Sequence, residues 1–166
     1  MVTALFIGRF QPLHLGHKSA IEHILSEVDK LILGIGSAQY NNTLDNPFTV
    51  DERKEMIEMV FSSSLDKIVI APVSDIHNEP KWVEHVLSSV PSFDVVYTSS
   101  PIEKRLFSEA GYTVVEIPYF KRKVYSGTRI RNLMAQEGSW RELVPSESVK
   151  IIEKFGGVAR LKSLME

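Results

Sequence analysis

The sequence predicts an α/β domain: a doubly wound parallel sheet with helices on both faces and a small C-terminal helical subdomain. Two observations predict this fold. Five short runs are apolar on both faces, and amphipathic segments of helix length lie between them. Strands that are apolar on both faces are buried on both sides, which is typical of parallel sheets built from strand–helix–strand units. The 166 residues suit one domain of this kind.

The expected elements follow in order along the chain. Strands are expected at 3–8, 30–36, 67–72, 93–98 and 113–118, and helices between them at 15–28, 49–61, 81–88 and 101–109. Thr49, with Glu52 three residues later, forms a capping box that predicts a helix start. Gly111 predicts the end of a later helix.

After the last expected strand the chain changes character. Residues 126–136, 148–154 and 158–164 predict helices with no further strand. We expect them to form a small subdomain that covers one edge of the sheet. The whole chain, 1–166, is thus predicted to be a single domain, with the sheet core at about 1–120 and the C-terminal helices at about 121–166. Ligands of doubly wound sheets bind beyond the carboxyl ends of the strands, so functional residues are expected there.

Composition excludes several classes of function. The chain has no cysteine, which excludes disulfides, thiol catalysis and zinc–thiolate sites. Its net charge of −2 gives no general attraction to nucleic acid or to an anionic membrane. No targeting signal or membrane-length apolar run is present. We therefore expect a cytoplasmic protein with neither nucleic acid nor membrane as a partner.

The segment that follows the first strand predicts an anion site. Gly8 and Arg9 end the strand, and His14 and His17 lie three residues apart where a helix begins, with Gly16 between them. A helix N-terminus favours anions through its free N–H groups and partial positive charge. A surface loop with two incidental histidines is one alternative, and a metal pair is another. The metal pair lacks a third ligand at a suitable spacing.

A second anion site is predicted far along the chain. Residues 121–131 hold five cations and no acid. Ser126 suits an N-cap position, and the apolar spacing that follows predicts a helix, so that Ser126, Gly127 and Thr128 offer hydroxyl and N–H donors. Arg131 reaches back over the first turn. A solvated basic face is the alternative, but two anion sites in one small domain suggest a polyphosphate ligand. The two sites are expected to converge in the fold.

A third motif, Gly34-Ile35-Gly36, lies at the end of the second expected strand. Such a pair of glycines often marks only a tight turn. At the carboxyl end of a strand in a doubly wound sheet, it can instead open space for a nucleotide.

These motifs carry a family resemblance. Residues 8–17, which end in His14-Leu15-Gly16-His17, resemble the H-x-G-H signature of the nucleotidyltransferase superfamily. Residues 125–131 resemble the closing I-S-x-T-x-x-R motif of that superfamily, with Tyr125 in the isoleucine position. Segments 36–39, 46–53, 75–82, 106–112 and 140–145 are similar to archaeal nicotinamide mononucleotide (NMN) adenylyltransferases. The resemblance runs from residue 4 to about residue 164.

The resemblance implies a Rossmann-like nucleotidyltransferase fold and a reaction that joins NMN and ATP to give NAD and pyrophosphate. It implies a catalytic set of Arg9, His14, His17 and Arg131. It implies that the ATP phosphates are bound by Gly8, Phe10, Gln11, Gly16, Ser126, Gly127 and Thr128. It implies that NMN is bound by Gly36, Ser37, Asp75, Ile76, Glu79 and Trp82. Mg²⁺ would be held through the triphosphate, without metal ligands from the chain. Related archaeal enzymes form homo-oligomers, so one is expected here.

Two departures bear on the acceptor. Asp45 stands where the family commonly has a basic residue, and Glu79 stands where it usually has asparagine. The alternatives are therefore a nucleotidyltransferase for another phosphorylated acceptor (phosphopantetheine, FMN or glycerol phosphate) or a non-catalytic nucleotide sensor. A tRNA synthetase fragment is disfavoured by chain length and charge. Trp82 has two interpretations, core packing or stacking on a pyridine ring. Trp140 is expected to pack in the core.

Overall fold

The computed structural model describes residues 1–118 and 123–166. Its centre is a parallel sheet of β1 (Thr3–Gly8), β2 (Lys30–Ile35), β3 (Ile68–Pro72), β4 (Val95–Thr98) and β5 (Thr113–Glu116). The strand order is β3-β2-β1-β4-β5, and Leu5 of β1 pairs with Ile32 of β2 on one side and Val96 of β4 on the other. The chain thus starts at the centre and winds outward twice, which confirms the predicted fold class.

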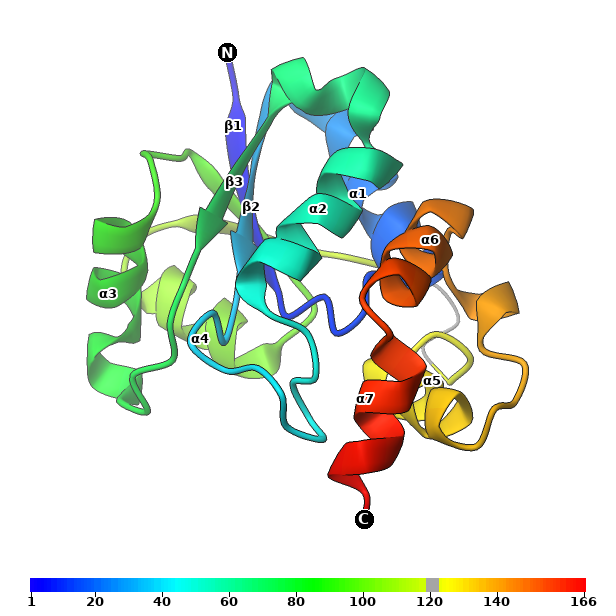
Figure 1. The fold of residues 1–166 in the computed structure, drawn as a ribbon. Coiled ribbons are helices and arrows are strands. Elements are labelled where there is room, and N and C mark those ends of the chain that lie inside the picture. Colours follow the sequence, from blue (N-terminus) through cyan, green and yellow to red (C-terminus); the bar gives the residue numbers. More distant parts are fainter. Residues whose placement is uncertain (119–122) are drawn as a thin grey trace.

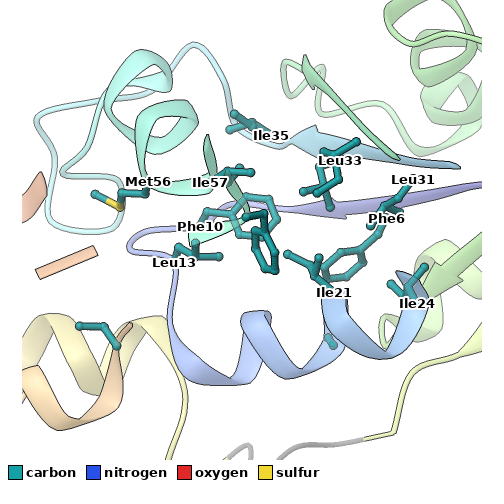
Figure 2. Packing of buried hydrophobic residues seen from close by; sticks show 14 of the residues in the cluster. Phe6, Phe10, Leu13, Ile21, Ile24, Leu31, Leu33, Ile35, Met56 and Ile57 are labelled. Carbon is teal, nitrogen blue, oxygen red and sulfur yellow. The ribbon is translucent and has the colours of Figure 1, made fainter. Parts of the chain in front are cut away.

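Helices cover both faces of the sheet. In Figure 1, α1 (Leu15–Glu27) and α2 (Val50–Val60) lie on one side, and α3 (Trp82–Ser89) and α4 (Pro101–Glu109) lie on the other. Side-chain alternation along β1 separates two cores. Phe6 faces α1 and α2, whereas Leu5 packs with Val86 of α3 and Phe107 of α4. Figure 2 shows the first core, where Ile21 of α1 lies beneath Phe6. Short 3₁₀ turns are η1 (Ser62–Lys67), η2 (Glu79–Lys81) and η3 (Arg141–Leu143).

Three C-terminal helices complete the fold: α5 (Gly127–Ala135), α6 (Ser146–Lys154) and α7 (Gly157–Leu164). They extend the α1–α2 side of the molecule and do not form the expected cover on a sheet edge. α6 packs against α2, and α7 packs against α5 and α6 (Figure 1). The reason is apolar and ionic matching: Ile151 and Ile152 join the core of α2, and Arg160 of α7 donates two hydrogen bonds, of 2.6 and 2.9 Å, to the carboxylate of Glu52.

Local capping explains where helices begin. Thr49 and Glu52 form the predicted capping box at α2, with bonds of 3.1 and 2.9 Å. Gly111 has φ of +89° just after α4, as a helix-ending glycine requires. Trp140 is buried in the core, as predicted. In the described part of the chain, no helix is long and apolar enough to cross a membrane.

Candidate active site

His14 and His17 cap the first turn of α1 with their own side chains. His14 is the N-cap: its Nδ1 accepts a hydrogen bond from the backbone N–H of His17, and Nδ1 of His17 accepts one from the backbone N–H of His14, both at 3.2 Å. The rings stack with centroids 3.6 Å apart. Because each Nδ1 is an acceptor, each neutral imidazole carries its proton on Nε2. The Nε2–H groups are therefore left as donors for a ligand.

Both imidazoles are held neutral. Burial lowers the pKa of His14 to about 4. Burial, the nearby His14 and the Arg9 guanidinium together lower the pKa of His17 well below its ordinary value. At neutral pH the pair thus offers uncharged N–H donors, and Arg9, which is exposed beside it, supplies the positive charge.

This pKa shift predicts a pH-dependent contribution to stability. The ordinary pKa of 6.5 falls to about 4 when His14 is buried, so near pH 5 the unfolded chain binds a proton that the folded chain does not. The stabilisation is complete above about pH 7 and is lost as pH falls toward 4; between pH 8 and pH 5 the loss is about 2 kcal/mol. Urea unfolding at both pH values should therefore show the wild type losing about 2 kcal/mol more than His14→Asn. That variant keeps a capping side chain and every other titrating group. Equal losses in the two proteins would contradict the shift.

The second predicted anion site begins α5. Ser126 is its N-cap and accepts a hydrogen bond from the backbone N–H of Arg129 at 3.2 Å. The N–H groups of Gly127 and Thr128 lie in the first turn, where a helix leaves N–H groups without partners from its own backbone. Lys121 and Arg122, which belong to the predicted basic run, lie outside the described residues.

Arg131 ties this helix to the first loop. Its guanidinium is buried, and Nη1 donates a hydrogen bond of 2.9 Å to the carbonyl of Gln11, 120 residues away in sequence. Nη2 lies 3.4 Å from the Thr128 hydroxyl and 4.0 Å from the carboxylate of Asp45. Burial, together with the charge of Arg9, lowers the pKa of Arg131. The two predicted anion sites are therefore in direct contact.

Both sites open into one cavity of about 320 Å³. Its walls include seven predicted residues: Arg9, His14, Gly16, His17, Ser126, Gly127 and Thr128. Among the described residues that line it there are basic, hydroxyl and apolar side chains but no carboxylate. It lies beside the carboxyl ends of β1 and β4, where the winding of the sheet reverses, which is the usual ligand position in such folds.

Gly16 is needed for this convergence. A Cβ at that position would lie 3.0 Å from the Cβ of Tyr125 and 3.0 Å from the His14 ring. A side chain there would push the start of α1 away from the segment that leads into α5. The absence of a side chain at Gly16 therefore lets the start of α1 and the segment before α5 lie close together.

Three other predicted residues, Gly8, Phe10 and Gln11, serve the packing of the loop between β1 and α1. A Cβ at Gly8 would lie 2.9 Å from the ring of Phe10, and that ring is buried with its edge toward His17. The amide of Gln11 is buried and bonds both the N–H and the carbonyl of Phe48 at 2.9 Å. None of these three residues, which were predicted to bind the ATP phosphates, is among those that line the cavity at the helix N-termini.

Arg53 organises the site from behind, and no interpretation of the sequence assigned it a role. It is fully buried, and its guanidinium donates to the carbonyls of Thr49, Arg9, Gly36, Ser37 and Tyr40 at 2.8–3.3 Å. Burial and the charge of Arg9 lower its pKa to about 10, so it remains a cation. One side chain thereby holds the carboxyl ends of β1 and β2 together.

A second cavity, of about 620 Å³, lies between α3 and α4. Of the residues predicted for NMN, it is lined by Asp75, Ile76, Glu79 and Trp82. Trp82 is half-buried, packs against the second core and also lines this cavity. Its packing interpretation holds in part, and stacking on a pyridine ring stays a prediction. Further lining residues were not predicted: His77, Asn78, Ser100, Ile102, Glu103 and Leu106.

Gly36 and Ser37 do not line this cavity and act through other groups. The Ser37 hydroxyl is buried and donates to the Asp75 carboxylate at 2.7 Å, so it positions that residue. Gly36 donates its N–H to the carbonyl of Gly8 at 2.8 Å, and a Cβ there would contact Ile7. These two residues join the strand ends to the Asp75 loop and do not touch the cavity themselves.

A third cavity, of about 400 Å³, lies next to the other two. It shares Ser99 and Ile117 with the cavity at the two helix N-termini, and it shares Ser100 with the cavity between α3 and α4. All three follow the carboxyl edge of the sheet around β4. A ligand with phosphates at one end and an aromatic ring at the other fits this arrangement.

Comparison with known proteins agrees with this geometry. The family model for cytidylyltransferase-like proteins matches residues 5–133. The nicotinamide-nucleotide adenylyltransferase of Archaeoglobus fulgidus is 44% identical over 169 residues, which covers 98% of this chain and 97% of the relative. The enzyme of the same name from Pyrococcus horikoshii is 45% identical and covers 99% of this chain and 89% of the relative.

A solved structure shows the same fold. A bifunctional NMN adenylyltransferase/ADP ribose pyrophosphatase from Francisella tularensis, complexed with AMP and a manganese ion, is 26% identical with a TM-score of 0.81. The match covers 99% of this chain but about half of that protein, 52% of its length. The family model and the full-length relatives show that the chain belongs to the nicotinamide-nucleotide adenylyltransferases of the cytidylyltransferase-like family.

Proposed function

We propose that the protein transfers the adenylyl group of ATP to the 5′-phosphate of NMN, forming NAD and pyrophosphate. The observation that carries the proposal is that two helix N-termini converge on one cavity, whose described lining has no carboxylate. The hydrogen bond from Arg131 to Gln11, residues 120 apart in sequence, holds the two segments together. A further cavity on the same edge of the sheet, lined by Trp82 and Asp75, suits the pyridinium ring of NMN, since an aromatic face and a carboxylate both favour a cation.

The reaction needs alignment and charge neutralisation from the protein. An oxygen of the NMN phosphate forms a bond to the α-phosphorus of ATP, and the bond to the bridging oxygen breaks, so that its electron pair leaves with pyrophosphate. The attacking phosphate is already anionic, so no protein nucleophile or general base is required. Arg9, with the Nε2–H groups of His14 and His17, is suited to stabilising charge on the phosphoryl oxygens. The first turn of α5 is suited to the pyrophosphate. Arg131, predicted as a catalytic residue, is buried and is not among the residues that line the cavity; its bond to Gln11 suits it to positioning this turn against the first loop.

Magnesium fits this site through the substrate. The described residues contain no group of three side chains that could hold a metal ion. The cavity at the two helix N-termini, here called the phosphate cavity, has no carboxylate in its described lining. Mg²⁺ would therefore be held by triphosphate oxygens and water. When bound, it supplies further neutralisation of the triphosphate charge.

Release of pyrophosphate tests the proposal directly. The protein is incubated with ATP or CTP and with each of four acceptors: NMN, phosphopantetheine, FMN and glycerol phosphate. We expect release only with ATP and NMN. Release with another acceptor and not NMN would overturn the choice of acceptor. Tight binding of ATP with no release from any acceptor would favour the nucleotide sensor.

A further inference from the structure

The cavity between α3 and α4 is rich in carboxyl groups. Asp75, Glu79 and Glu103 line it, and no lysine or arginine is among its described lining residues. This is the opposite of the phosphate cavity, whose described lining is basic and free of carboxylates. The two cavities therefore differ in charge, and the acidic cavity between α3 and α4 favours a cationic or neutral group over an anionic one.

Two of these three carboxyl groups already have partners within the chain. Asp75 accepts a hydrogen bond from the Ser37 hydroxyl at 2.7 Å, and Glu79 forms an ion pair of 2.8 Å with Arg105. Glu103 differs. Its backbone N–H is bonded to the Ser100 hydroxyl at the start of α4, but its carboxyl has no hydrogen-bond or ion-pair partner among residues 1–118 and 123–166.

Burial of this acceptor without a partner has a cost. The side chain is partly buried, and burial raises its pKa to about 7. Polar groups in such positions are usually hydrogen-bonded, and a free carboxyl that lines a ligand cavity gains most from a ligand that brings an N–H or O–H donor. Glu103 is thus the carboxyl group in this cavity that has no partner in the described chain, so all of its acceptor capacity is available to a ligand.

We propose that Glu103 is a specificity-determining residue that accepts a hydrogen bond from the carboxamide of the nicotinamide ring and so selects NMN over its deamidated analogue, nicotinic acid mononucleotide. This inference rests on the proposed function. The carboxamide brings two N–H donors and no charge. The analogue brings a carboxylate, which has no donor and would lie among three carboxyl groups. Rejection therefore comes from a lost hydrogen bond and from repulsion.

The test compares kcat/KM for the two mononucleotides with ATP in three proteins: wild type, Glu103→Gln and Glu84→Gln. Glu84 is exposed on the neighbouring helix α3 and lines none of the three cavities, so its variant removes the same charge without touching the site. We expect the wild type to prefer NMN by about 100-fold or more. Glutamine can donate to a carboxylate, so Glu103→Gln should lower this preference at least about 10-fold. Glu84→Gln should keep it.

Further measurements separate the possible failures. Glu103→Asp retains a carboxyl and should still reject the acid, which distinguishes charge from packing. Dissociation constants of both mononucleotides, measured by calorimetry without ATP, should show the same order of preference. Equal use of both substrates by the wild type, or an unchanged preference in Glu103→Gln, would overturn the role of Glu103 and leave adenylyl transfer intact. Absence of turnover with either mononucleotide would instead count against the proposed function, and the binding preference would then decide the role of Glu103.

Discussion

Replacing His17 by alanine is expected to lower kcat about 100-fold or more, with a smaller change in KM for ATP. The reason is the position of the Nε2–H donor, which the bond from the His14 backbone to Nδ1 fixes in a cavity where phosphoryl charge develops. Loss of one preorganised donor of this kind typically costs about 10²- to 10³-fold in kcat. Steady-state pyrophosphate release at saturating ATP and NMN measures the effect.

Two controls separate this role from a structural one. His23→Ala changes a histidine on the same helix that pairs with Glu27 outside the cavity, and it should keep near-normal kcat. His17→Ala also removes the acceptor for the His14 N–H, a loss of about 1 kcal/mol, so thermal unfolding should show that the variant is folded. A folded His17→Ala protein with nearly wild-type kcat would refute a catalytic role for His17.

Replacing Arg53 by methionine is expected to lower the free energy of unfolding by about 3–5 kcal/mol. The guanidinium bonds five carbonyls at the ends of β1 and β2 and around the start of α2, and methionine would leave those acceptors buried without donors. Activity should fall too, because two of these carbonyls belong to Arg9 and Ser37, whose backbone would lose its support.

Urea unfolding of Arg53→Met checks this expectation against Lys54→Met. Lys54 is the next residue on α2 and is exposed, so its replacement should change stability by less than about 0.5 kcal/mol. Arg53→Lys keeps the charge, but an ammonium group cannot span all five carbonyls, and most of the loss should remain. A loss below about 1 kcal/mol in Arg53→Met would show that water replaces the guanidinium.

Much of the fold follows from local signals. The apolar runs located all five strands to within about two residues, because strands buried on both faces leave little ambiguity in a doubly wound sheet. The C-terminal helices were predicted as elements but placed wrongly. Their apolar faces are visible in the sequence, whereas the surfaces that they pack on, α2 for α6 and the pair α5 and α6 for α7, are defined only by tertiary packing.

The candidate site divides in the same way. A motif such as residues 8–17 marks a position in the chain, but it does not say whether a residue offers its side chain or its backbone. Gln11 illustrates this, since its side-chain amide is hydrogen-bonded to the backbone of Phe48, while its backbone carbonyl accepts a hydrogen bond from Arg131. Arg53 ends segment 46–53 of the family resemblance, but nothing in the sequence says that its side chain bonds the carbonyls of distant loops. Glu103 carries no signal because it lies in an ordinary amphipathic helix. The homo-oligomer and the cytoplasmic location stay predictions, which sedimentation and cell fractionation would check.

The reciprocal bonds between His14 and His17 couple the stability of the first turn of α1 to the orientation of the two imidazoles. The atoms that start the helix also aim the imidazoles, so the first turn cannot fray without dismantling the reaction centre. Conversely, an occupant that engages both rings clamps the turn. Slower exchange of the His14 and His17 backbone amides in heavy water should therefore report that a ligand is bound, even without turnover.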